Sequence, residues 1–180
     1  MIFAITLLQS SLCPVQRSDQ KNSILSGRFV AFADSAKHRR TLEIFMTLYL
    51  NRSDEGGAKP TKILVADDNQ PSAMTLSWAM EAFGHEVRTC YNGREAVEEA
   101  MTFYPDVVLL DIGMPVMDGL DACRAMRAQP GMGGTLIIAQ TAWSDTEARE
   151  KSAAAGFNFH MVKPIDLDEV ERLVSTRAKK

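Results

Sequence analysis

The sequence predicts an α/β fold, a doubly wound five-stranded parallel sheet that follows a poorly defined N-terminal extension. From residue 61 onward, short apolar stretches alternate five times with longer helix-forming stretches. This alternation is typical of a parallel sheet whose right-handed crossovers place helices on both faces. The central apolar stretch, residues 107–110, shows no polar alternation, as expected for a strand that is buried on both faces.

The chain length suits one domain of ordinary size plus an appendage. The 180 residues are 46% hydrophobic and 24% charged, and domains most often have about 100–150 residues. We expect residues 1–60 to form an N-terminal extension and linker, partly disordered or with a short helix. Apolar residues at helical spacing in 42–49 predict that helix, and the polar stretch 51–61, with paired glycines and a proline, predicts the linker. Residues 61–180 would form the main domain.

Charge and cysteine usage exclude several classes of protein. The net charge is -3, but residues 61–180 hold eighteen acidic and twelve basic residues, which does not favour a nucleic-acid interface. The three cysteines are an odd number without C-x-x-C spacing, so neither a disulfide framework nor a zinc site is indicated. Residues 1–8 are apolar but lack the basic region of a signal peptide, and no stretch reaches the ~20 apolar residues of a membrane span. We expect a cytoplasmic protein that contacts neither nucleic acid nor membrane directly.

Turn and capping residues divide the main domain into elements. The predicted strands are 62–66, 86–90, 107–110, 135–140 and 157–162. The predicted helices are 73–83, 94–103, 118–128, a helix between Ser144 and Gly156, and 165–177. Pro71 suits the first turn of the first helix, and Gly84 suits its end. The pair Asn92 and Gly93 separates the second strand from the second helix.

The later elements have boundary signals of their own. Gly113, Pro115 and Gly119 turn the chain from the central strand into the third helix, which begins at Asp118 or a neighbour. The loop QPGMGG precedes the fourth strand. Ser144, followed three residues later by Glu147, predicts a capping box for the fourth helix. Gly156 then predicts the end of this helix.

Polar residues gather where the strands end. Asp67, Asp68, Asp111, Thr141 and Lys163 each lie at or just beyond the carboxyl end of a predicted strand. In a parallel sheet these ends share one edge, which is where open α/β sheets bind ligands. A carboxylate at the end of a buried strand is unfavourable unless a partner compensates its charge. We therefore expect these side chains to meet in one cleft.

Three carboxylates in one cleft favour a divalent cation. Without compensation they would repel each other and raise one another's pKa. Mg²⁺ prefers oxygen ligands and keeps several waters. Asp68 and Asp111 would bind it directly, the carbonyl of Gly113 could add a third protein oxygen, and Asp67 would act through a water.

The same set of residues suits phosphoryl transfer to Asp111. This chemistry depends mainly on positioning and on electrostatic stabilisation of the phosphoryl oxygens. Thr141 can donate a hydroxyl hydrogen bond to one such oxygen, and Lys163 can pair with another. Taken singly, each residue also has a structural explanation, since Asp67 and Asp68 could cap a helix and Lys163 could be an exposed loop lysine. Their appearance at successive strand ends, in this order, favours a shared function.

Residues 61–178 resemble the receiver domain of response regulators in bacterial two-component signalling, the CheY-like superfamily. The motifs that carry the resemblance are ILVADDN, VVLLDIGMPVMDG, IIAQTA and MVKP. The resemblance implies a flavodoxin-like strand order 2-1-3-4-5, Asp111 as the aspartyl-phosphate site and an Mg²⁺ pocket at Asp67 and Asp68. It further implies that Thr141 and Lys163 are the switch and phosphate-contacting residues. Such a domain is not a classical enzyme, although it catalyses its own phosphorylation and dephosphorylation.

Two positions depart from the family's usual pattern. His160 occupies the switch position three residues before Lys163, where the family often has Tyr or Phe. Histidine can also rotate in and out of a pocket, and it can respond to pH. Gly113 stands two residues after Asp111, where a larger side chain often tunes the lifetime of the phosphate. Neither departure removes a group that the chemistry needs.

Four functional settings are compatible with the sequence. The first is a stand-alone receiver that takes a phosphoryl group from a sensor histidine kinase or a histidine phosphotransfer protein and then binds a target protein. The second is the receiver of a hybrid histidine kinase. The third is a pseudo-receiver that binds partners without phosphate. The fourth, a phosphohydrolase of the haloacid dehalogenase type, needs a second Asp two positions after the nucleophile, where this chain has Gly113.

Overall fold

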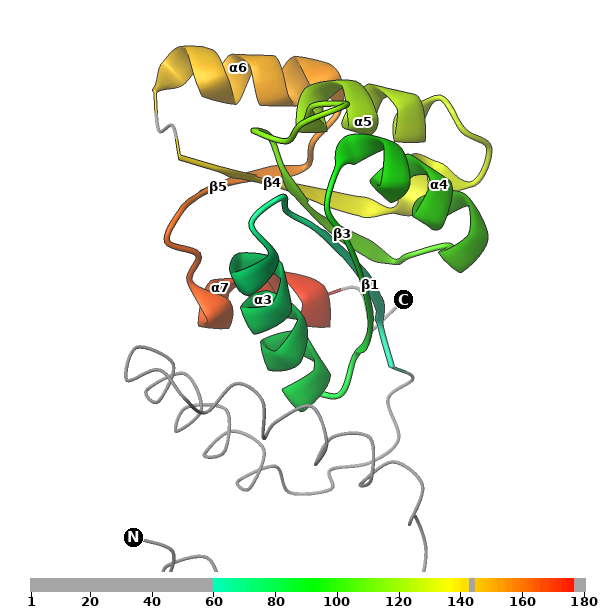
Figure 1. Cartoon of the computed structure of the whole chain (residues 1–180), viewed down its shortest axis with the longest axis vertical. Helices are drawn as coiled ribbons and strands as arrows, with labels where there is room; N and C mark the ends of the chain where they lie inside the picture. The colour runs from blue at the N-terminus through cyan, green and yellow to red at the C-terminus, as the bar shows by residue number, and fades with distance from the viewer. Residues whose placement is uncertain (1–59, 143–144, 177–180) are drawn as a thin grey trace, which may run out of the picture. The chain divides into compact units, whose positions relative to one another are not determined.

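The computed structural model describes residues 60–142 and 145–176 (Figure 1). The predicted linker and the short helix at 42–49 therefore lie outside the described residues, apart from the last positions of the linker. The strands are β1 (Lys62–Ala66), β2 (Glu86–Cys90), β3 (Val107–Asp111), β4 (Leu136–Thr141) and β5 (Phe159–Val162). The helices are α3 (Gln70–Ala82), α4 (Gly93–Phe103), α5 (Gly119–Arg127), the short 3-10 helix η2 (Met132–Gly134), α6 (Thr146–Ala155) and α7 (Leu167–Ser175).

The five strands form one parallel sheet in the order β2-β1-β3-β4-β5. This order confirms the predicted fold class. The central strand β3 is buried along its whole length, which explains its unbroken apolar sequence. In the register of the sheet Asp111 pairs with Gln140, and Thr141 pairs with Val162. The carboxyl ends of β3, β4 and β5 therefore lie side by side at one edge.

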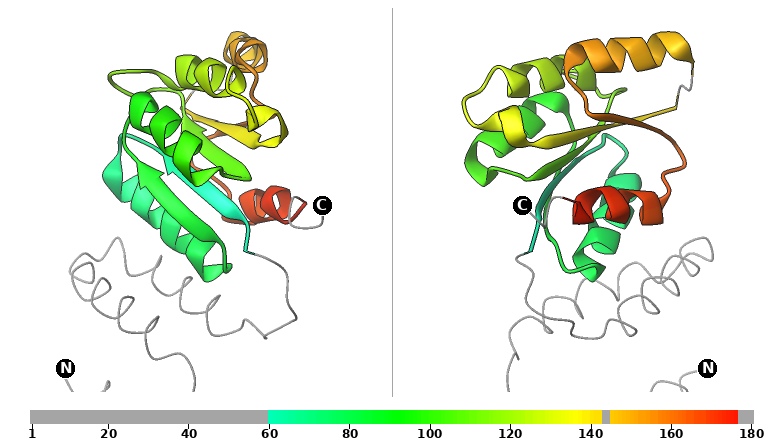
Figure 2. Two further views of the ribbon diagram at one scale, coloured as in Figure 1. Left: turned by 90° about the vertical axis from the view of Figure 1, so that its right-hand side faces the viewer. Right: turned by 180° about the vertical axis from the view of Figure 1, so that it is seen from behind.

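Helices cover both faces of the sheet, as Figures 1 and 2 show: α4, α5 and α6 lie on one face, and α3 and α7 lie on the other. Two separate cores result. The core under α4, α5 and α6 contains Leu64, Val108, Leu110, Ile137 and Ala139 from the strands. The core under α3 and α7 contains Ile63, Val65, Val107, Leu109, Leu136, Ile138 and Met161. Successive strand residues point to opposite faces, so β1, β3 and β4 each supply both cores.

Helix starts differ from the prediction where an aspartate provides the cap. The fourth predicted helix, α6, begins at Thr146, and the side chain of Asp145 accepts the backbone N–H of Ala148 at 2.7 Å. The predicted cap Ser144 lies outside the described residues. The last helix begins at Leu167 instead of Ile165, because Asp166 accepts N–H groups of the first turn. A carboxylate at a helix N-terminus satisfies donors that have no partner within the helix.

The fifth strand is shorter than predicted. It begins at Phe159 instead of Phe157. Gly156 ends α6 with a φ of 101°, and Asn158 then accepts the backbone N–H of Ile137 with its side-chain oxygen at 2.8 Å. The side chain of Asn158 thus occupies a backbone donor of β4 that a longer β5 would have used.

Within residues 60–142 and 145–176, no helix is both long and apolar enough to cross a membrane.

Candidate functional site

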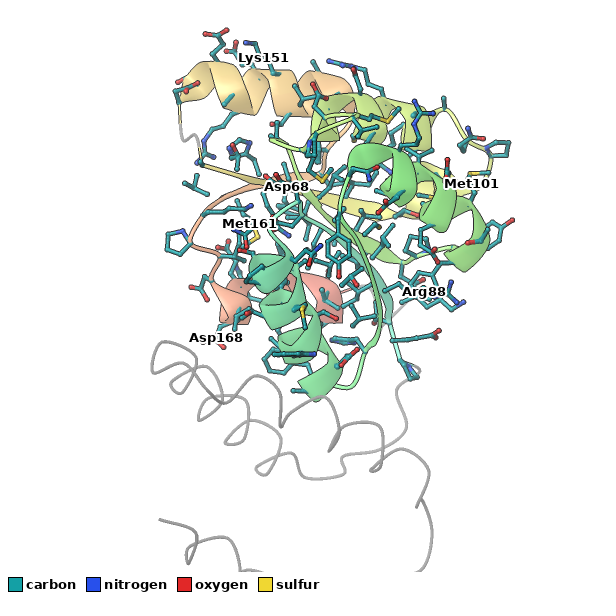
Figure 3. All side chains as sticks on the ribbon, viewed as in Figure 1. Asp68, Arg88, Met101, Lys151, Met161 and Asp168 are labelled. Carbon is teal, nitrogen blue, oxygen red and sulfur yellow. The ribbon has the colours of Figure 1, made fainter. Side chains whose placement is uncertain are left out.

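Three aspartates meet at the carboxyl edge of the sheet. Asp67 and Asp68 follow β1 directly, and Asp111 is the last residue of the neighbouring strand β3. One carboxylate oxygen from each lies within 4.8 Å of the others. Asp67 and Asp111 are buried, whereas Asp68, labelled in Figure 3, is exposed. The cluster is therefore accessible from solvent on the side of Asp68.

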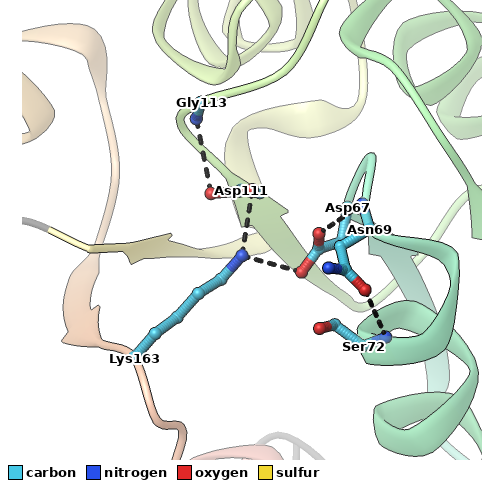
Figure 4. Close-up of polar contacts among 6 residues, drawn as sticks. All are labelled: Asp67, Asn69, Ser72, Asp111, Gly113 and Lys163. Atoms are coloured by element: carbon cyan, nitrogen blue, oxygen red, sulfur yellow. Dashed lines mark hydrogen bonds and ion pairs between the residues drawn. The ribbon is translucent and has the colours of Figure 1, made fainter.

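Lys163 reaches this cluster from the end of the edge strand β5. Its Nζ donates hydrogen bonds to Oδ2 of Asp67 at 2.8 Å and to Oδ2 of Asp111 at 2.9 Å (Figure 4). The residue follows β5, two strands away from β3, so its long side chain crosses the end of β4. Its backbone N–H donates to the carbonyl of Thr141 at 2.8 Å, which fixes the start of the side chain against β4.

Backbone donors orient the two buried carboxylates. The N–H of Asn69 donates to Oδ1 of Asp67 at 2.9 Å, and the N–H of Gly113 donates to Oδ1 of Asp111 at 3.3 Å. Asn69 is also the N-cap of α3, because its Oδ1 accepts the N–H of Ser72 at 3.1 Å (Figure 4). The start of α3 therefore holds the loop that carries Asp67.

The ionisation of the cluster reflects burial and the lysine together. Burial raises the pKa of Asp67, because loss of water disfavours its charged form more than the hydrogen bond from Lys163 favours it. Burial alone would lower the pKa of Lys163. Its hydrogen bonds to Asp67 and Asp111, and their negative charges, outweigh that effect and raise the pKa. The ammonium group is thus firmly charged at neutral pH.

The donor set of the cluster fits a hard divalent cation. Carboxylate oxygens are the ligands that Mg²⁺ prefers, and three of them converge here. Gly113 lies on the exposed side of the loop after β3, and a Cβ at this residue would meet no atom within 4 Å. The surroundings of Gly113 therefore leave room for a cation and its waters beside Asp111.

Gly119 lets the loop after β3 return close to the strand. A Cβ at Gly119 would lie 2.1 Å from the backbone oxygen of Asp111 and 2.8 Å from Cα of Ile112. The N–H of Gly119 donates to the carbonyl of Ile112 at 3.0 Å. Only a residue without a side chain permits this approach, which draws the N-terminus of α5 against the end of β3.

Thr141 and His160 lie on the other face of the sheet. Thr141 is the buried last residue of β4, and by strand alternation it shares a face with Ala139. His160 is the register partner of Ala139 on β5. Its Nδ1 lies 3.0 Å from Oγ of Ser152 on α6. Because the Ser152 hydroxyl donates to the carbonyl of Ala148 at 2.8 Å, Nδ1–H of His160 is the donor to Ser152.

The structure brings four of the predicted site residues together. The carboxylates of Asp67, Asp68 and Asp111 are close enough to bind one metal ion, and Lys163 donates hydrogen bonds to two of them. Thr141 is adjacent to this cluster through its backbone contact with Lys163, and His160 contacts α6 instead. The sequence reasoning missed Ser152, and nothing in the spacing of α6 distinguishes it. It also treated Gln140 only as a strand residue, although Gln140 is the one polar side chain between Leu136 and the strand end at Thr141.

The fold and this site define a doubly wound α/β domain with an acidic cluster and a lysine at the carboxyl edge of its sheet. The family model of the response regulator receiver domain matches residues 63–175, and the chain belongs to this family. The match confirms the family that the sequence motifs indicated.

Curated relatives support the same family. The regulatory protein AtoC of Escherichia coli is 36% identical over 113 residues, which are 63% of this chain and 24% of AtoC. The response regulator ArlR of Staphylococcus aureus is 34% identical over 110 residues, which are 61% of this chain and 49% of ArlR. This chain thus matches half or less of the length of either relative.

Solved structures share the fold. A putative response regulator from Chloroflexus aurantiacus superposes with a TM-score of 0.63 at 29% identity, covering 68% of this chain and all of that one. The receiver domain of a sensor histidine kinase from Pseudomonas aeruginosa gives the same TM-score and coverage at 30% identity, and its structure has a magnesium ion coordinated in the active-site cleft. The chemotaxis response regulator CheY4 of Vibrio cholerae has a TM-score of 0.62 at 28% identity, covering 66% of this chain and 99% of CheY4.

Proposed function

We propose that Asp111 is the phosphoacceptor of this receiver domain and takes a phosphoryl group from a sensor histidine kinase or a histidine phosphotransfer protein. The observation that carries the proposal is the position of its carboxylate, which lies at the carboxyl edge of the sheet, 2.9 Å from Nζ of Lys163 and within ligand distance of Asp67 and Asp68. Asp67 shares the contact with Lys163, but Asp111 is the one that ends the central strand β3, between the Asp67–Asp68 pair after β1 and Thr141 at the end of β4.

The transfer is a displacement at phosphorus. An oxygen of Asp111 forms a bond to phosphorus, the bond from phosphorus to the donor imidazole nitrogen breaks, and that nitrogen keeps the electron pair. Lys163 pairs with a phosphoryl oxygen as the charge develops, and the hydroxyl of Thr141 donates to another. Water later attacks the phosphorus, which returns Asp111 as a carboxylate and releases phosphate. The domain is thus a participant in phosphotransfer and not a classical enzyme.

We further propose that Asp67, Asp68, Asp111 and the carbonyl of Gly113 hold Mg²⁺, with Asp67 acting through a water. Bound there, the cation would neutralise negative charge on the phosphoryl oxygens. The supporting observation is the convergence of three carboxylate oxygens beside an open glycine. The structure of the Pseudomonas aeruginosa relative, with magnesium in its cleft, is consistent with this assignment.

Phosphorylation would change the surface through Thr141 and His160. A phosphate adds about -1.5 to -2 charges at neutral pH, enough to redirect the nearby hydroxyl of Thr141. His160 would then exchange its hydrogen bond with Ser152 for an inward position, shifting the population between two packings of α6. Amide NMR spectra with and without beryllofluoride test this step, and an unmoved His160 region would contradict it.

A mass measurement tests the phosphoacceptor. The protein is incubated with acetyl phosphate and Mg²⁺, and we expect a gain of one phosphoryl group that disappears in Asp111→Asn. Asp121→Asn is the matched control, because Asp121 is an exposed aspartate on α5, and this variant should keep the gain. No gain in the wild-type protein would favour a pseudo-receiver, and steady turnover of unrelated phosphate esters would favour a phosphohydrolase.

The receiver domain could act alone or as part of a hybrid histidine kinase. We propose a cytoplasmic receiver whose output is contact with another protein, either free-standing or attached to a hybrid histidine kinase. Phosphotransfer rates from purified kinases and from purified phosphotransfer proteins, compared under the same conditions, would show which kind of donor supplies the phosphoryl group.

A further inference from the structure

Gln140 is a buried polar residue in an otherwise apolar strand. It follows Leu136, Ile137, Ile138 and Ala139 on β4, and only 2% of its surface is exposed. Its Nε2 is buried and has no hydrogen-bond partner among the residues that the structure describes. A buried donor without an acceptor is unfavourable, and most such groups in folded proteins are paired. The amide therefore has an unused donor.

The register of the sheet places Gln140 beside the phosphoacceptor. Gln140 is the direct register partner of Asp111, and neighbouring strands lie only about 4.8 Å apart. By alternation its side chain is on the face of Leu136 and Ile138, which is also the face that Asp111 continues from Val107 and Leu109. The two residues are thus neighbours on one face of the sheet at its carboxyl edge.

In the resting site each oxygen of Asp111 already accepts a hydrogen bond from another group. Oδ1 of Asp111 accepts the N–H of Gly113, and Oδ2 accepts the ammonium of Lys163. A phosphoryl group on Asp111 adds three strong acceptor oxygens at this place. An uncharged donor that is already buried would meet them without having to give up a bond to another group.

We propose that Gln140 donates a hydrogen bond from Nε2 to the phosphorylated side chain of Asp111, and so belongs to the phosphate-binding residues of the site. The inference rests on the proposed phosphoacceptor role of Asp111. It assigns to β4 a second donor beside the Thr141 hydroxyl, on the opposite face of the strand. The phosphoryl group would then be bound from both sides of the sheet edge.

Beryllofluoride, which adopts the geometry of a phosphoryl group on an aspartate, is the probe. In Mg²⁺ buffer, we expect the beryllofluoride concentration at half-saturation to rise roughly tenfold in Gln140→Met, equivalent to about 1.4 kcal/mol for one hydrogen bond to a charged group. Methionine keeps the length and volume of the side chain but lacks the donor. The loss of phosphate from Asp111 should be altered in the same variant, measured by mass spectrometry after acetyl phosphate is removed.

Thr61→Val is the matched control. The hydroxyl of Thr61 is the other buried side-chain group without a partner in the described part of the chain, but it precedes β1 and so lies at the opposite edge of the sheet. Both substitutions remove an unpaired buried donor, so both should raise the melting temperature. Only Gln140→Met should weaken beryllofluoride binding, because only Gln140 neighbours Asp111.

The outcomes separate this inference from the proposed function. Wild-type binding in Gln140→Met would overturn the role of Gln140 while leaving the phosphoacceptor intact. No response of the wild-type protein to beryllofluoride or acetyl phosphate would instead refute the phosphoacceptor itself. If Gln140→Met does not fold, the side-chain NH₂ signals of Gln140 in the wild-type protein decide, since the hydrogen bond requires them to shift on beryllofluoride addition and unchanged signals would exclude it.

Discussion

Replacement of Lys163 by methionine should destabilise the protein because it leaves two buried carboxylates without their cation. Nζ of Lys163 lies 2.8 Å from Asp67 and 2.9 Å from Asp111, and the two carboxylate side chains are only 2% and 9% exposed. Removal of one partner from a buried ion pair typically lowers stability by about 3–5 kcal/mol. Since the lysine side chain is 29% exposed, solvent screens part of this effect, and we expect a loss of about 2 kcal/mol.

Urea denaturation in EDTA measures this loss, with Lys151→Met as the control. Lys151 pairs with Glu147 at 2.6 Å, but the two side chains are 60% and 75% exposed, and Lys151 stands on the face of α6 turned away from the sheet (Figure 3). Its replacement should leave the free energy of unfolding unchanged. A similarly small effect of Lys163→Met would refute the view that the lysine compensates the buried carboxylates.

The deficit of Lys163→Met should also depend on pH and on Mg²⁺. The pKa of Lys163 is raised, so its contribution is complete at neutral pH and is lost only as the pH rises through that value, above 10.5. On the acid side, the deficit should shrink as Asp67, whose pKa is raised by burial, becomes protonated. The proposed Mg²⁺ would bind the oxygens that Lys163 now contacts, so saturating Mg²⁺ should restore much of the stability of the variant. A deficit that does not respond to Mg²⁺ would count against a cation site at these aspartates.

Three further predictions follow from local geometry. Gly119→Ala should lower the free energy of unfolding by about 3 kcal/mol or more, because its Cβ would meet strand backbone. Gly113→Ala should fold normally, since a Cβ at that residue meets no atom within 4 Å. Thermal melts of the two variants compare these effects. Val116, 75% exposed with a φ of 70°, should gain about 1 kcal/mol on replacement by glycine, because a β-branched residue is strained in the left-handed region; an unchanged urea midpoint would argue against that strain. Burial raises the pKa of the thiols of Cys90 and Cys123 to about 12 and about 11. In a Cys13→Ser variant at pH 8, neither thiol should therefore react with a thiol reagent until the domain unfolds.

The fold could be predicted from the sequence because its strands are apolar and its turns carry glycine, proline and asparagine at the required places. Boundaries were less predictable where a side chain replaces a backbone contact. Asn158 shortens β5 by satisfying a backbone donor of β4, a contact between residues that lie far apart in the sequence. Asp145 caps α6 where a neighbouring serine had an equally suitable side chain, so local preference alone did not decide the cap.

The predicted site depended on one topological inference, that the ends of parallel strands share an edge. It is sufficient to predict that Asp67, Asp111 and Lys163 lie together, as their hydrogen bonds show. It could not reveal Ser152, whose contact with His160 depends on how α6 is rotated above the sheet. Nor did it single out Gln140, because its burial and its missing acceptor become visible only in three dimensions.

The alternation of β4 and β5 assigns two tasks to two sides of one β-sheet. Asp111 and Gln140 are on the face of the sheet covered by α3 and α7, while Thr141 and His160 are on the face covered by α4, α5 and α6, where His160 contacts Ser152 of α6. Substitutions at exposed positions of α6, away from Ser152, should therefore change the surface of this layer with little direct effect on Asp111. An engineer who wants to change the surface of this domain could therefore begin with the exposed residues of that one helical layer.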